Sequence, residues 1–141
     1  MTNVADAKRL VAESGRMLLT EGLAARTWGN VSCRIGKDMI VITPSGLGYE
    51  GMTPEDIVLM NMDIGEGEGD LKPSSEKGVH ISAYRMLADV GFVIHTHQVY
   101  ASAIGLAGIE NLCLTAEEEN ALGGIAVADY GLPGTKKLAK N

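Results

Sequence analysis

Residues 72–80 read KPSSEKGVH, and residues 92–97 read FVIHTH. Proline is common just before a helix or in its first turn, and Ser74 or Ser75 can cap that helix by accepting from a free backbone N–H group. The first stretch therefore predicts a helix start with Glu76 in the first turn. There its carboxylate either complements the helix dipole or takes part in chemistry.

The second stretch predicts a buried strand that ends in polar residues. Side chains at positions i and i+2 of a strand point to the same face, so His95 and His97 are expected to project together. Two imidazoles on one face suit a zinc ion, which in catalytic sites has three protein ligands and one open position. Two ordinary histidines are the alternative. The position of His95 and His97 at the end of a strand favours the metal site, because binding sites in α/β folds gather at strand ends.

Composition limits the classes of protein that fit. The 141 residues correspond to one domain, residues 1–141, and 45% hydrophobic but only 4% aromatic residues predict an aliphatic core. A net charge of −6 argues against nucleic-acid and acidic-membrane partners. Cys33 and Cys113 lie far apart in no metal-type spacing, which is typical of free thiols in a reducing compartment. With no long apolar run and no signal-like segment, we expect a cytoplasmic protein.

The first half of the chain predicts a helix and a hairpin. Apolar residues recur at helical spacing over 4–21, and Gly22 is a plausible stop. Alternation over 31–35 predicts a half-buried strand that turns into a second strand over 39–43. The glycine-containing segment 44–48 is either an ordinary turn or a loop that brings backbone N–H groups to a phosphate.

The remaining elements are expected to be short. Thr53 starts a capping box with proline at the first helical position, and a strand follows over 57–60. The acidic glycine patch 65–70 is expected to be a flexible connection. The later segments predict helices at 99–106, at 116–122 (capped by Thr115) and at 136–141 (capped by Thr135), with strands at 112–115 and 125–128.

Five ordered motifs resemble the class II aldolase/adducin family across most of the chain. They are GNVS at 29–32, TPSG at 43–46, KPSSE at 72–76, HTH at 95–97, and Tyr130 followed by GT at 134–135. The resemblance implies an α/β fold, a three-layer α/β/α sandwich with a mixed central sheet, in a homotetramer with sites at subunit boundaries.

The resemblance also implies an activity and its residues. A Zn²⁺ ion held by His95, His97 and a third histidine would polarise a ketose phosphate of the fuculose or rhamnulose 1-phosphate type, which is cleaved to dihydroxyacetone phosphate and an aldehyde. Glu76 would be the acid/base. The sugar phosphate, as the small-molecule partner, would be held through its phosphate by Gly29, Asn30, Ser45, Gly46, Ser74 and Ser75.

The sequence departs from the family pattern in two places. The family's third histidine lies in a His-Gly segment that does not occur in these residues, so we expect either a C-terminally truncated domain or a degenerate one. His80 lies on the predicted helix and is expected to be structural. The tyrosine that donates a proton to the leaving aldehyde in fuculose-type enzymes aligns with Thr115, which cannot do so.

Other activities occur within the same family. The resemblance also admits a sugar-phosphate epimerase or dehydratase, or a non-catalytic, adducin-like binding module. Epimerases of the family carry aspartate at the position of Glu76, and the binding modules lack the metal histidines. Glu76, His95 and His97 therefore favour the aldolase.

Overall fold

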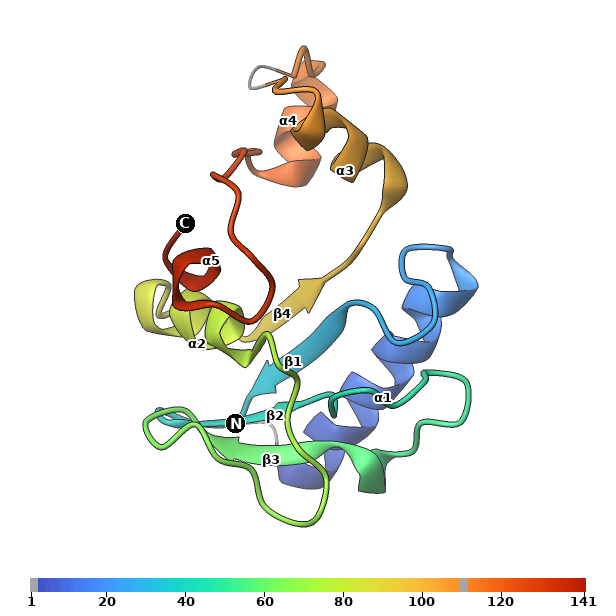
Figure 1. Cartoon of the computed structure of the whole chain (residues 1–141), viewed down its shortest axis with the longest axis vertical. Helices are drawn as coiled ribbons and strands as arrows, with labels where there is room; N and C mark the ends of the chain where they lie inside the picture. Colours follow the sequence, from blue (N-terminus) through green and yellow to red (C-terminus); the bar gives the residue numbers. More distant parts are fainter. Residues whose placement is uncertain (1–2, 110–111) are drawn as a thin grey trace.

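The computed structural model describes residues 3–109 and 112–141 (Figure 1). Two helices and four strands form its main body: α1 (Val4–Thr20), β1 (Asn30–Arg34), β2 (Met39–Ile42), β3 (Val58–Asn61), α2 (Lys77–Met86) and β4 (Phe92–His95). A single 3₁₀ turn, Pro54–Asp56, precedes β3. Three short helices follow β4: α3 (Val99–Leu106), α4 (Ala116–Leu122) and α5 (Lys136–Lys140).

The strands form one sheet in the order β3-β2-β1-β4. Asn30 pairs with His95 and Ser32 with Ile42, so β1 is the strand that connects the hairpin to β4. With helices packed against one four-stranded sheet, the α/β class is confirmed. A mixed sheet was expected, and the three pairings among the described strands are all antiparallel.

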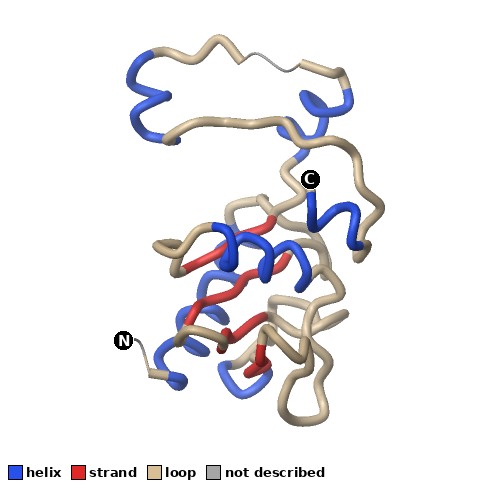
Figure 2. Tube along the Cα trace, turned by 90° about the vertical axis from the view of Figure 1, so that its left-hand side faces the viewer, coloured by secondary structure: helices blue, strands red, loops and turns tan. Residues whose placement is uncertain are grey.

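Side-chain alternation along β2 divides the core into two layers. Val41 faces α1 and packs with Val11, whereas Ile40 and Ile42 face the opposite side and pack with Tyr84 of α2. Figure 1 shows α1 and α2 on opposite sides of the sheet, and Figure 2 shows the strands between layers of helix. The expected α/β/α layering is therefore present.

Two predictions about burial were wrong. The strand over 31–35 was expected to be half-buried, but Ser32 is fully buried, because α2 covers the face that would otherwise meet water. The strand over 92–97 was expected to be buried, but it ends at His95 and Ile94 is 52% exposed. β4 is the last strand in the described sheet order, so no further strand shields it.

Two expected strands, 112–115 and 125–128, do not form among the described residues. A strand needs a neighbouring strand to satisfy its backbone groups, and Figure 1 shows this part of the chain well away from the sheet. The expected helices at 99–106, 116–122 and 136–141 do form, with Thr115 and Thr135 as their N-caps for the last two.

The helix that was expected to begin at Ser74 or Ser75 begins later. α2 starts at Lys77, and Glu76 is its N-cap residue. The reason is a tertiary pairing: the Ser45 N–H donates to the Lys72 carbonyl at 2.9 Å and the Ser74 N–H to the Thr43 carbonyl at 3.1 Å. Residues 72–74 are thereby held in an extended conformation and cannot enter the helix.

None of the helices in the described ranges combines the length and the apolar character that crossing a bilayer requires.

Candidate active site

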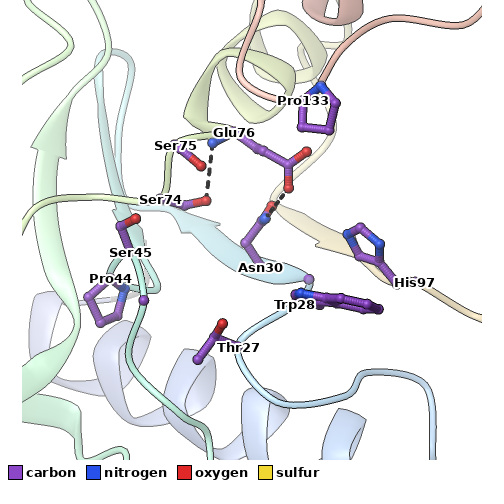
Figure 3. Close-up of a pocket in the computed structure, with 12 residues that line it drawn as sticks. Thr27, Trp28, Asn30, Pro44, Ser45, Ser74, Ser75, Glu76, His97 and Pro133 are labelled. Carbon is purple, nitrogen blue, oxygen red and sulfur yellow. Dashed lines mark hydrogen bonds between the residues drawn. The ribbon is translucent and has the colours of Figure 1, made fainter.

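The pairing of residues 43–45 with 72–74 brings two distant motifs to the rim of one cavity. Its volume is about 460 Å³, and all six residues expected to hold a phosphate line it: Gly29, Asn30, Ser45, Gly46, Ser74 and Ser75 (Figure 3). Glu76 and His97 line it as well. The cavity thus combines serine hydroxyl groups, which can donate to an oxyanion, with a carboxylate and an imidazole.

Gly29 is required by the way the chain enters β1. Its φ angle is +80°, and a Cβ atom at this position would lie 2.7 Å from the backbone oxygen of His95. Only glycine combines that backbone conformation with such a close approach. The absence of a side chain at Gly29 therefore allows β1 to lie against the end of β4 and places Asn30 beside the histidine strand.

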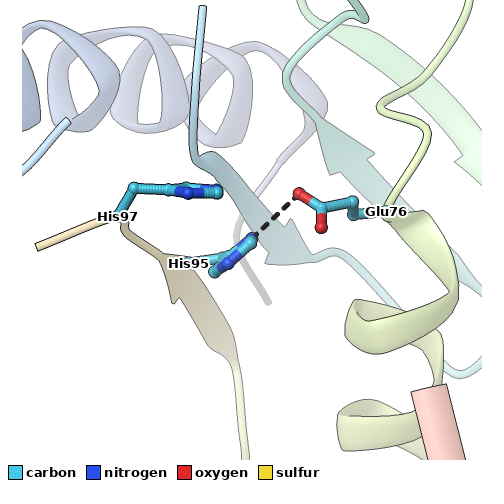
Figure 4. A group of neighbouring side chains, drawn as sticks. All are labelled: Glu76, His95 and His97. Carbon is cyan, nitrogen blue, oxygen red and sulfur yellow. Dashed lines mark ion pairs between the residues drawn. The ribbon is translucent and has the colours of Figure 1, made fainter. Parts of the chain in front are cut away.

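Glu76 lies where the sheet, the cavity and the start of α2 meet. The residue is buried, and Nδ2 of Asn30 donates to its Oε2 atom at 2.9 Å. The same oxygen lies 3.1 Å from Nδ1 of His95 (Figure 4). The backbone N–H of Glu76 donates to the Ser74 hydroxyl at 3.2 Å, so the pairing of residue 74 with the sheet also positions the carboxylate.

His95 and His97 point to the same side of the chain although the strand ends at His95. Their ring centroids are 4.8 Å apart, and the ring of His97 lies 5.6 Å from that of Trp28. Burial lowers the pKa of His95; the charge of Glu76 opposes this shift, and His97 adds to it. The low pKa favours the neutral imidazole, which is the form that binds metal.

These side chains fit a divalent cation. Glu76, His95 and His97 each offer a ligand atom, and the three atoms lie within 4.8 Å of one another. Nδ1 of His95 is buried and has no hydrogen-bond partner among the described residues, although Glu76 is 3.1 Å away. Two ligand atoms on a tetrahedral zinc ion are about 3.3 Å apart, so this close, unbonded pair has the spacing of ligands to a common ion.

His80 and Thr115 lie outside this group of donors. His80 is fully buried on α2, where its ring nitrogens contact Asn30 and Ser32. Thr115 is the N-cap of α4; its hydroxyl bonds Glu118, and it is not among the residues that line the cavity.

Three residues of the cavity wall lie outside all of the motifs singled out in the sequence. Thr27 and Trp28 directly precede the GNVS motif, and the single tryptophan of the chain, two positions before Asn30, was a usable signal. Pro133 comes from a segment that returns to the site after α4, and no local pattern predicts such a return.

Comparison with known proteins identifies the family. The family model for the class II aldolase and adducin N-terminal domain matches residues 9–141. The chain therefore belongs to the class II aldolase and adducin family.

Individual relatives agree with this assignment. The chain is 36% identical over 126 residues to 5-deoxy-D-ribulose 1-phosphate aldolase of Bacillus thuringiensis serovar kurstaki, an alignment that covers 89% of this chain and 59% of the relative. An L-fuculose 1-phosphate aldolase structure matches with a TM-score of 0.83 and 31% identity over 96% of this chain and 64% of that one. The chain thus spans about three fifths of these relatives.

A more distant structure shows the fold alone. YgbL of Escherichia coli, described as a putative aldolase/epimerase/decarboxylase, matches with a TM-score of 0.86 and 22% identity. The alignment covers 97% of this chain and 68% of YgbL.

Proposed function

We propose that this protein is a metal-dependent aldolase that cleaves a ketose 1-phosphate to dihydroxyacetone phosphate and an aldehyde. The observation that carries the proposal is a Glu-His-His donor group of which two members, Glu76 and His97, line a serine-containing cavity. The aldolases to which the chain is similar are named for 5-deoxy-D-ribulose 1-phosphate and L-fuculose 1-phosphate, both ketose 1-phosphates.

In this proposal the serine-lined half of the cavity binds the phosphate. Ser45, Ser74 and Ser75 offer hydroxyl groups, and Gly46, with a φ angle of +76°, turns the backbone at the rim without adding a side chain. Fixing the phosphate there holds the carbon chain of the sugar toward Glu76 and His97, which lie on the wall of the same cavity.

His95 and His97 would hold the cation, for which zinc is the expected metal because it accepts imidazole nitrogen readily. When bound, the cation would act as a Lewis acid on the carbonyl and hydroxyl oxygens of the substrate. Glu76 can contribute a third ligand while no substrate is present. The homotetramer and the cytoplasmic location expected from the sequence stay predictions.

Glu76 is proposed to move the proton. When the carbon–carbon bond breaks, the hydroxyl group on the departing carbon gives its proton to water and becomes the aldehyde carbonyl, and the electron pair of the broken bond stays with the three-carbon phosphate. The Glu76 carboxyl group then supplies the proton that completes dihydroxyacetone phosphate. In the direction of synthesis, the carboxylate removes that same proton. Its buried position beside Asn30 keeps the carboxylate oriented for both transfers.

The test measures metal content and cleavage together. Wild-type protein loaded with zinc is expected to release dihydroxyacetone phosphate from 5-deoxy-D-ribulose 1-phosphate or L-fuculose 1-phosphate. At saturating zinc, Glu76→Gln should lower kcat by about 10²- to 10⁴-fold, because a positioned acid/base contributes that much. His95→Ala should lose the metal instead.

Two results would overturn the proposal. One is zinc-loaded wild-type protein that cleaves neither ketose 1-phosphate. The other is a Glu76→Gln variant with wild-type turnover. Zinc analysis of each sample separates a failure of chemistry from a failure of metal binding, and absence of bound zinc in the wild-type protein would favour a binding module.

A further inference from the structure

A row of buried, hydrogen-bonded side chains runs from Glu76 away from the cavity into the protein. Asn30 donates to Glu76 at 2.9 Å, and its Oδ1 atom contacts Nε2 of His80. Nδ1 of His80 lies 2.6 Å from Oγ of Ser32, which in turn lies 2.8 Å from the hydroxyl of Tyr84. We refer to Asn30, His80, Ser32 and Tyr84 as the buried row. All four side chains are at most 3% exposed.

The bonding capacities of these groups determine the direction of each hydrogen bond. A carboxylate only accepts, so the NH₂ group of Asn30 faces Glu76 and its carbonyl oxygen faces His80. An amide oxygen also only accepts, so Nε2 of His80 carries the hydrogen. In a neutral imidazole the other nitrogen accepts, so the Ser32 hydroxyl donates to Nδ1 of His80.

The surroundings of His80 keep it neutral. Burial lowers its pKa to about 4, and the charge of His95 contributes a smaller lowering. At neutral pH the imidazole therefore has one N–H group, and Ser32 and Asn30 assign that group to Nε2.

We propose that His80 is a positioning residue for the acid/base: by donating from Nε2 to Asn30, it holds the Asn30 amide with its NH₂ group toward the Glu76 carboxylate. The inference rests on the proposed function of Glu76. His80 is fully buried and does not line the cavity, so it acts only through Asn30.

The consequence follows from the two ends of an amide group. Without a donor at the position of His80 Nε2, the buried amide oxygen of Asn30 has no partner, and only the Glu76 carboxylate itself still favours the native orientation of the amide. A rotated amide would direct its oxygen at the carboxylate, and two acceptors repel each other. Glu76 would then lose the hydrogen bond that orients it, although no atom that touches the substrate had been changed.

Two amide variants separate this role from simple packing. The side-chain nitrogen of His80→Gln can reach the position of His80 Nε2 and donate to Asn30. The side-chain nitrogen of the shorter His80→Asn reaches only the position of Nδ1, next to Ser32. Both variants place a neutral amide in the same buried space, so His80→Gln is the matched control.

The kinetic readout is the exchange of a carbon-bound proton of dihydroxyacetone phosphate with deuterium from solvent, catalysed by the zinc-loaded protein. This exchange requires Glu76 but no aldehyde. His80→Gln is expected to stay within about threefold of the wild-type rate. His80→Asn should lose one to two orders of magnitude in maximal rate, with unchanged zinc content. Equal rates in the two variants would overturn the proposal.

A second readout does not depend on activity. Nitrogen-15 NMR of the wild-type protein should show His80 as the neutral tautomer protonated at Nε2, and the Asn30 side-chain NH₂ should be protected from exchange with water in wild type and His80→Gln but not in His80→Asn. A proton on Nδ1 would overturn the proposal whatever the rates. If the wild-type protein fails to exchange the proton while the tautomer and the protection are as expected, the assignment of Glu76 as acid/base fails and the order of the buried row stands.

Discussion

The part of the chain up to His97 and the distal segment, residues 98–132, differ sharply in burial. Among the residues that the structure describes, every large side chain that is fully buried belongs to the first part, from Val11 to His80. In the distal segment many apolar side chains are exposed, and Leu106 is 88% exposed. Figure 1 shows α3 and α4 standing apart from the sheet and its two covering helices. Because buried apolar area is the main source of folding free energy, the first part carries the stability.

The first part of the chain also fixes the geometry of the candidate site. Glu76 and His95 belong to elements of the first part, and His97 is its last residue. The distal segment returns to the cavity only at Pro133, after which α5 packs against α2. Residues held by a packed core keep their mutual distances, which a metal site and an acid/base require.

The largest effect should come from truncating the core. Ile40→Ala removes a fully buried side chain between β2 and α2, and it should lower the free energy of unfolding by about 2–5 kcal/mol. Ile125→Ala, at a half-exposed position of the distal segment, should change it by about 0.5 kcal/mol or less. Urea titration measures both. Equal losses would mean that the distal segment is part of the cooperative core.

A second effect is a loss of stability at low pH, which arises from His80 in the first part of the chain. The pKa of His80 is about 4 in the folded protein and about 6.5 when unfolded, so the unfolded state binds more protons between these values. Stability should therefore fall as the pH drops from 6.5 to 4, and this residue should account for about 3 kcal/mol of the loss.

The measurement compares wild type with His80→Gln by urea unfolding at several pH values, with metal removed by a chelator. Gln does not titrate, so between pH 6.5 and pH 4 the variant should lose about 3 kcal/mol less of its free energy of unfolding than the wild type does. Parallel pH profiles for the two proteins would show that burial of a neutral His80 contributes nothing to acid sensitivity.

The smallest effect should be confined to the distal segment. The Thr115 hydroxyl accepts from the Glu118 N–H at 3.3 Å, and the Glu118 carboxylate accepts from the Thr115 N–H at 2.8 Å. Thr115→Ala should destabilise α4 by about 1 kcal/mol. Hydrogen exchange should accelerate in α4 and stay unchanged in β1 and β2. A loss of about 1 kcal/mol in the free energy of global unfolding would show instead that α4 is part of the cooperative core.

Patterns of short range were read correctly from the sequence. The spacing of apolar residues predicted α1, and the left-handed Gly22 follows its end as expected. Alternation predicted the hairpin of β1 and β2, and threonine caps predicted α4 and α5. The six expected phosphate residues line one cavity, although their roles remain predictions.

Errors arose where a distant contact overrides a local pattern. Ser74 has the composition of a helix cap, but pairing with Thr43 draws it into an extended segment. Alternation marked Ser32 as solvent-facing, but α2 covers it. The segments 112–115 and 125–128 have strand-like composition, and strands form only where a partner lies beside them.

The sequence by itself determined the local helices and strands, the types of side chain that can bind a metal or a phosphate and, through ordered motifs, the family. Only the tertiary structure decided that Asn30 connects Glu76 to His80. Asn30 lies on β1, whereas Glu76 and His80 lie at the start and in the interior of α2, and the three meet where α2 packs on the sheet. A hydrogen bond depends on atoms within about 3 Å, whatever their separation along the chain. The role of His80 therefore became visible only once the residues of the buried row were placed next to one another.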